Sequence, residues 1–305
     1  MASAPARLAI ALALVAALPA QAALKVFACE PEWAALAVEV GGDLVSAYAA
    51  TTGRQDVHQI QARPSLIAKL RSADLLVCTG AELEVGWLPM LLRQAANPRV
   101  QPGAAGYFEA ASAVTMLELP TAVDRALGDI HPYGNPHLQT DPRNLIPVAL
   151  ALAKRMAALD GAHAADYARG AQRFEQRWRS QLARWAARAA PLAGQRFVAH
   201  HNSWPYLAAW LGIDVVGFLE PKPGIPPSST HLAQLLDGLE SQPVRGIVRS
   251  GYEDARPSEW LAQRTGARAL LVPQTIGAVP AAKDLTSLYD AMLDSLLGAL
   301  PPGGG

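Results

Sequence analysis

One stretch near the middle of the 305-residue chain has the spacing of a single long helix. Its large or apolar side chains recur every three or four residues, at Tyr167, Ala171, Phe174, Trp178, Leu182, Trp185 and Ala189. These intervals place them on one face of a helix, and arginines fill the other face. A helix over 163–190 would be about 42 Å long, and Pro191 would end it. It could run along two domains and fix their relation, although a surface helix of one domain has the same pattern.

Short apolar runs alternate with helical patterns on both sides of this stretch. The strand-like runs are at 24–28, 44–48 and 74–78 before it, and at 196–199, 214–219, 245–249 and 268–272 after it. Helical patterns fall at 33–40, 64–71 and 82–96, and at 203–211, 229–240, 257–265 and 284–300. Such alternation is typical of parallel sheets covered by helices.

We therefore predict an α/β protein with two open lobes, each built on a parallel sheet, joined by the long helix. The predicted N-terminal lobe covers residues 23–144, a helical linker covers 145–192, and the C-terminal lobe covers 193–305. A content of 51% hydrophobic residues is enough for two buried cores. The 26 basic residues balance the 26 acidic ones, so charge does not indicate a nucleic-acid partner.

Residues 1–22 have the pattern of a secretory signal peptide. Arg7 precedes an apolar run over 8–18, which is too short to span a bilayer, and Ala20-Gln21-Ala22 offers small residues for cleavage. We predict cleavage near Ala22/Ala23 and a periplasmic mature protein.

The chain has two cysteines, Cys29 and Cys78, and both stand at the ends of predicted strands. If those strands are neighbours, a disulfide could form in an oxidising compartment. Two buried free thiols have the same sequence pattern, because adjacent strand ends do not guarantee bonding geometry.

Histidines occur in three loops that could face the same edge of the two sheets. His58 follows the second predicted strand, and His200 and His201 directly follow the strand over 196–199. His131 and His137 lie in a segment stiffened by two prolines. In open α/β sheets, ligands bind beyond the carboxyl ends of the strands. Imidazole suits Zn²⁺, whereas Mn²⁺ prefers more oxygen ligands, but scattered histidines alone are a weak motif.

Several strings of residues resemble one known family. They are Asp56-x-His58, Gly134-Asn135-Pro136-His137 followed by Asp141-Pro142, His201-Asn202-Ser203-Trp204-Pro205-Tyr206, and the stretch over 217–228. In this order they are similar to the zinc/manganese solute-binding proteins of ABC importers, in the cluster with a rigid helix between two α/β lobes. The similarity covers essentially the whole mature chain.

This resemblance implies that His58, His137 and His201 bind a metal ion in the cleft between the lobes. It places His201, rather than His200, in the ligand position. It also implies a monomeric periplasmic carrier that delivers the ion, Zn²⁺ ahead of Mn²⁺, to an ABC permease in the inner membrane.

The chain departs from the family pattern at two places. The region 107–129 has no histidine-rich segment, and the loop over 273–280 lacks the acid that usually provides a fourth ligand. The remaining candidates for the fourth position are His131, Glu220 and water. We predict His131, because a closed set of nitrogen ligands is a common zinc arrangement.

Two other functions share these features. A zinc-dependent hydrolase also uses three histidines and a water, but no clear general base or HExxH string accompanies them here. A zinc chaperone or buffer without a transporter would have the same ligands. We predict a binding protein and no enzyme.

Overall fold

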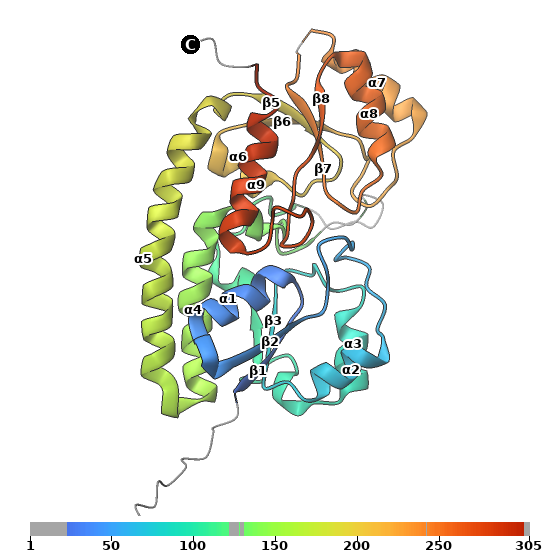
Figure 1. The fold of residues 1–305 in the computed structure, drawn as a ribbon. Coiled ribbons are helices and arrows are strands. Elements are labelled where there is room, and N and C mark those ends of the chain that lie inside the picture. The colour runs from blue at the N-terminus through green and yellow to red at the C-terminus, as the bar shows by residue number, and fades with distance from the viewer. Residues whose placement is uncertain (1–22, 122–127, 129–130, 242, 302–305) are drawn as a thin grey trace, which may run out of the picture.

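The computed structural model describes residues 23–121, 128, 131–241 and 243–301. The predicted signal peptide, residues 1–22, lies outside the described residues. Figure 1 shows two lobes stacked on one another, with one long helix running along both. Within the described ranges, no helix combines the length and the apolar character needed to cross a membrane.

The first lobe is a parallel sheet with the strand order β2-β1-β3-β4. Its strands are β1 (Leu24–Ala28), β2 (Val45–Ala49), β3 (Leu75–Cys78) and β4 (Tyr107–Glu109). The helices α1 (Pro31–Gly41), α2 (Pro64–Arg71) and α3 (Leu88–Ala95) connect and cover them. The three predicted strands are confirmed to within a residue at each end, while the short strand β4 was not predicted.

The predicted helix over 82–96 is wrong in its first turns, because α3 begins only at Leu88. Ala81 and Glu82 have φ values of 51° and 66°, which a right-handed helix does not allow. The Glu84 carboxylate accepts hydrogen bonds from the backbone N–H groups of Thr79 at 2.7 Å and Gly80 at 3.1 Å. These bonds hold the segment as a series of turns at the end of β3.

The second lobe repeats this design with the order β6-β5-β7-β8. Its strands are β5 (Arg196–Ala199), β6 (Asp214–Phe218), β7 (Gly246–Arg249) and β8 (Arg268–Leu271). Its helices are α6 (Pro205–Leu211), α7 (Ser229–Leu239), α8 (Ala255–Thr265) and α9 (Leu285–Leu297). All four predicted strands are confirmed, with ends that differ by no more than one residue.

The predicted long helix is confirmed as α5 (Ala164–Ala189), which follows α4 (Leu145–Leu159). It packs against α4 and α1 beside the first lobe and against α9 beside the second. Its apolar face, including Tyr167, Phe174 and Trp185, is buried in a core that continues from one lobe into the other. A continuous apolar core resists separation of the lobes on this side, because opening it would expose that surface to water.

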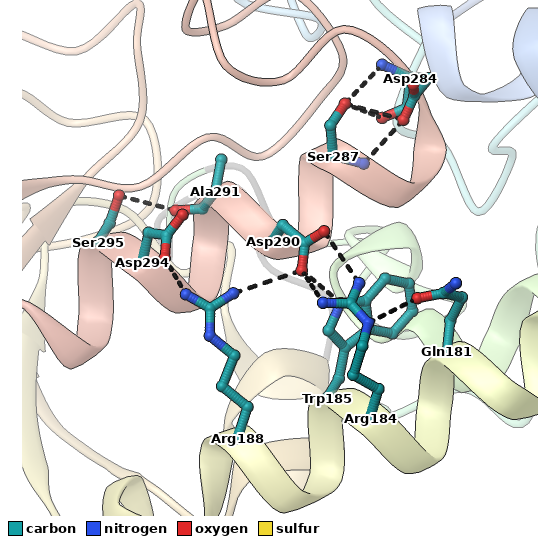
Figure 2. A network of polar contacts seen from close by, with 10 residues as sticks. All are labelled: Gln181, Arg184, Trp185, Arg188, Asp284, Ser287, Asp290, Ala291, Asp294 and Ser295. Carbon is teal, nitrogen blue, oxygen red and sulfur yellow. Dashed lines mark hydrogen bonds and ion pairs between the residues drawn. The ribbon is translucent and has the colours of Figure 1, made fainter.

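Polar contacts add to the attachment of α5 to α9 (Figure 2). One oxygen of Asp290 accepts a hydrogen bond from the Trp185 indole N–H at 2.9 Å, and the other accepts from Arg184 at 2.9 Å. Arg188 lies 3.3 Å from the same carboxylate. At the start of α9, Asp284 is the N-cap residue, since its side chain accepts a hydrogen bond from the backbone N–H of Ser287.

Cys29 and Cys78 form a disulfide, which settles the alternative that the sequence left open. Cys29 directly follows β1 and Cys78 is the last residue of β3, and these two strands pair with each other. Their Cα atoms are 4.8 Å apart, and both residues are buried. The bond ties together the carboxyl ends of two strands, next to the loops that carry the polar residues described below.

Candidate metal centre

Three of the predicted histidines meet between the lobes. Candidate ligand atoms of His58, His137 and His201 all lie within 4.8 Å of one another. His58 comes from the loop between β2 and α2, His137 from the loop before α4, and His201 from the loop between β5 and α6. The group therefore draws on loops at the carboxyl ends of strands in both sheets, as expected for ligand sites in open α/β folds.

A neighbouring carboxylate orients His58. Its Nδ1 lies 2.8 Å from Asp56 Oδ1, and the same oxygen accepts the backbone N–H of His58 at 3.0 Å. Burial alone would raise the pKa of Asp56, but the hydrogen bonds from His58 lower it overall, so the carboxylate is ionised near neutral pH. An ionised acceptor requires Nδ1 to carry the proton. The buried Nε2 of His58 has no hydrogen-bond partner, so it is the ring nitrogen left for a ligand.

His201 has the same kind of support. Its Nδ1 lies 2.7 Å from Glu220 Oε2, and this oxygen also accepts the backbone N–H of Gly224 at 3.0 Å. Glu220 follows β6, so a strand end in the second sheet holds the carboxylate in place. Glu220 was considered as a fourth ligand from the sequence, and here one of its oxygens is engaged with His201. Carboxylates that bond the far nitrogen of a histidine are common behind metal ligands.

His137 is the most buried of the three, at 1% exposed. Burial lowers its pKa well below the usual value, and the nearby His58 and His201 lower it further, so the ring is neutral near pH 7. Its Nε2 is buried without a partner. The loop that carries it is fixed by Asn135, whose side chain accepts from the His137 backbone N–H at 3.0 Å and donates to Asn202 O at 2.8 Å.

His131 lies beside this group but outside it. Its ring centroid is 5.6 Å from that of His58, and its Nε2 is buried without a partner. Burial, followed by the neighbouring His58 and His201, lowers its pKa to about 4. The group with mutual distances under 4.8 Å holds three histidines and does not include His131 or His200.

Gln274 is a residue of the candidate site that the sequence analysis did not predict. It lies in the loop after β8, the loop in which the expected acid is absent, and it is 5% exposed. Its Nε2 is 3.4 Å from His137 Nδ1, and its Oε1 accepts a hydrogen bond from the Ser250 hydroxyl. A neutral amide thus occupies this side of the site. Only its position after the last strand of the sheet could have indicated it.

Together, the fold and the clustered imidazoles define a metal-binding solute-binding protein with two α/β lobes. Residues 26–299 match the model of the ZnuA family, described as zinc-uptake complex component A periplasmic. The chain therefore belongs to this family and is a periplasmic metal-binding component of an ABC importer. The family consists of solute-binding proteins and not of enzymes.

The similar proteins are named for different metals. The iron-binding protein YfeA of Yersinia pestis is 24% identical over 247 residues, which cover 76% of this chain and 71% of that protein. The high-affinity zinc uptake system protein ZnuA of Brucella abortus is 23% identical over 164 residues, covering 54% of this chain and 48% of that protein. This chain thus matches about half the length of the Brucella protein.

Solved structures share the fold. A crystal structure of ZnuA has a TM-score of 0.77 at 23% identity, covering 91% of this chain and 99% of that one. A manganese-bound mutant of a periplasmic metal-binding protein from Candidatus Liberibacter asiaticus has a TM-score of 0.74 at 18% identity, covering 90% and 99%. The predicted two-lobe architecture is confirmed by these likenesses, which at such identities concern the fold alone.

Proposed function

We propose that the protein carries Zn²⁺ as its cargo, bound by the Nε2 atoms of His58, His137 and His201, and hands it to the permease of an ABC importer. The observation that supports this proposal most is the convergence of the three imidazoles, two of which have a carboxylate behind Nδ1. Imidazole nitrogens suit Zn²⁺ better than ions that prefer oxygen, and the carboxylates behind His58 and His201 orient those two rings. The name of the Brucella relative, a zinc uptake protein, agrees with this choice.

A competition titration of the metal-free protein tests the choice of ion. With three nitrogen ligands, we expect Zn²⁺ to bind more tightly than Mn²⁺ by at least about 100-fold. Chelators of known affinity for each ion provide the two constants on the same preparation. Equal affinities, or tighter binding of Mn²⁺, would refute zinc as the preferred cargo.

His131 is our candidate for the fourth ligand. Its unpartnered Nε2 and its position against His58 support this role, since a modest shift of its loop would bring a fourth nitrogen to the ion. His131→Ala is expected to weaken zinc binding about tenfold or more. Glu220→Gln is the comparison variant, because the amide oxygen can still accept the His201 hydrogen bond, and a smaller loss is expected. Unchanged zinc affinity in His131→Ala would refute His131 as the fourth ligand.

The proposal also includes the boundaries of the two lobes and the site at which the signal peptide is cleaved. We assign residues 23–144 to the N-terminal lobe, 145–192 to the helical linker and 193–305 to the C-terminal lobe. The signal peptide would be removed near Ala22/Ala23, and the exported carrier would act as a monomer. Intact mass and light scattering of the exported protein test both points, and a lipid adduct on Cys29 or a stable dimer would contradict them.

A further inference from the structure

One exposed carboxylate connects the loops that carry two of the proposed ligands. Oε2 of Glu118 accepts a hydrogen bond from the side-chain amide of Asn135 at 3.0 Å and a second one from the side-chain amide of Asn202 at 2.8 Å. Asn135 stands two residues before His137, and Asn202 directly follows His201. A single oxygen therefore bridges the loop before α4 and the loop between β5 and α6.

The side chain of Asn135 transmits this contact to His137. Its oxygen accepts the backbone N–H of His137 at 3.0 Å, and its nitrogen donates to Asn202 O at 2.8 Å as well as to Glu118. The amide oxygen and both amide hydrogens are thus engaged with three different partners. A displacement of the Glu118 carboxylate would reach the backbone of His137 through this one side chain.

Tyr206 holds the segment of Glu118 against the same loop. Its hydroxyl accepts the backbone N–H of Leu117 at 3.0 Å and donates to Asn135 O at 2.8 Å. Leu117 O in turn accepts the backbone N–H of Asn135 at 2.8 Å. Tyr206 belongs to α6, the helix that follows the loop of His201. Residues 117 and 118 are therefore fixed by both ligand loops at once.

The backbone of Glu118 indicates that its place is strongly determined. Its φ is 53°, in the left-handed region that residues other than glycine rarely adopt. Such a conformation is unfavourable and persists where surrounding contacts hold it. Glu118 is exposed, so burial of its side chain does not explain the conformation. The conformation does bring the carboxylate to Asn135 and Asn202 together.

We propose that Glu118 is a positioning residue of the metal site, which holds His137 and His201 at the spacing that a bound ion requires. It acts on these histidines, whose ring centroids are 5.6 Å apart, through Asn135 and Asn202. The proposal rests on the assignment of His137 and His201 as ligands of Zn²⁺. Two ligands held in place beforehand lose less freedom when the ion arrives, so the bridge raises the affinity for it.

Zinc affinity of the full mature protein, measured by competition with a chelator, tests the bridge. Glu118→Ala should weaken zinc binding about tenfold, because it removes both hydrogen bonds. Glu118→Gln should stay within about threefold of the unmutated protein, since an amide oxygen can accept the same two bonds. The matched control is Glu82→Ala, which should leave zinc affinity unchanged. Glu82 is also exposed and has a φ of 66°, and its side chain takes no part in this network.

Further measurements separate positioning from a general loss of structure. Metal-free Glu118→Ala should unfold at the same temperature as the unmutated protein, because the side chain that it removes is exposed. The visible absorption of the Co²⁺-loaded protein, which reports ligand geometry, should change in Glu118→Ala and return in Glu118→Gln. Glu118→Ala should also cost less zinc affinity when Asn202→Ala is already present, since both variants break the same hydrogen bond.

Zinc affinity unchanged in Glu118→Ala would overturn the proposal. Equal losses in Glu118→Ala and Glu118→Gln would overturn it as well, because they would show that the negative charge acts and the hydrogen bonds do not. His201→Ala tests the ligand assignment separately. If His201→Ala loses zinc while Glu118→Ala binds it normally, only the positioning role fails. Zinc binding unaffected by His201→Ala would contradict the proposed function, and the role of Glu118 with it.

Discussion

Replacing His201 by alanine is expected to weaken zinc binding by at least about 100-fold, whereas His200→Ala should change it by less than about threefold. The two residues are adjacent in sequence, but only His201 belongs to the group of ligand atoms within 4.8 Å. Truncating His201 would remove one of the three proposed nitrogen ligands and leave the half-buried Glu220 carboxylate without its partner at 2.7 Å. His200 Nδ1 has no hydrogen-bond partner whose loss could disturb the site.

Competition with a chromophoric zinc chelator measures both variants on one scale. Thermal unfolding of the metal-free proteins serves as the control, because both substitutions shorten a side chain in the same loop and should leave the fold intact. Equal losses of affinity, or a larger loss in His200→Ala, would show that the ligand register of this motif is shifted by one residue.

The fold was predictable where a local pattern decides the structure. The helix α2 begins and ends at the predicted residues Pro64 and Arg71, because proline starts it and its apolar spacing is helical. The strand β4 has three residues, too few for a periodic signal. The late start of α3 depends on hydrogen bonds from the backbone N–H groups of Thr79 and Gly80 to the Glu84 carboxylate. These bonds form only in the folded loop, so the helical spacing of the sequence does not predict them.

The candidate site was also predictable only in part. Loops that follow parallel strands converge at one edge, so His58 and His201 could be expected to meet. The resemblance to solute-binding proteins was needed to favour His201 over His200. The partner of His201 could not be predicted, because Glu220 is 19 residues away and reaches it only through the pairing of β5 with β6. The contact of Gln274 with His137 arises from the three-dimensional packing of the two lobes.

The lobes contact each other through two different kinds of interaction. On the side of α5, a continuous apolar core and the Asp290 contacts hold them together (Figure 2). On the side of the histidines, the contact consists of loops and polar groups, such as the bond from Thr275 to Glu32. Because loops yield more easily than a packed core, we expect metal affinity to depend on how closely these loops approach.

Gly53→Ala is expected to weaken zinc binding about 30-fold through this contact. An added Cβ at residue 53 would lie 2.1 Å from the backbone nitrogen of Ala278 and 2.4 Å from the carbonyl carbon of Gly277. Gly53 follows β2 and Ala278 follows β8, so the overlap lies between the two lobes and backbone must move to relieve it. Overpacking of this kind costs about 2 kcal/mol. A tenfold change in affinity corresponds to about 1.4 kcal/mol, so a cost of about 2 kcal/mol weakens zinc binding about 30-fold if binding needs the two loops to approach closely.

Gly251→Ala is the matched control on the other side of the same contact. Its Cβ would lie 3.4 Å from Ala278 O and 3.4 Å from Gly53 O, distances that a small adjustment accommodates, so zinc affinity should fall by less than about threefold. Small-angle scattering of the metal-free proteins should detect a larger radius of gyration for Gly53→Ala alone, because the loops would be forced apart. Zinc affinity and radius both unchanged in Gly53→Ala would mean that the loop carrying Ala278 yields without moving the lobe. The close approach of the two loops would then not control metal binding.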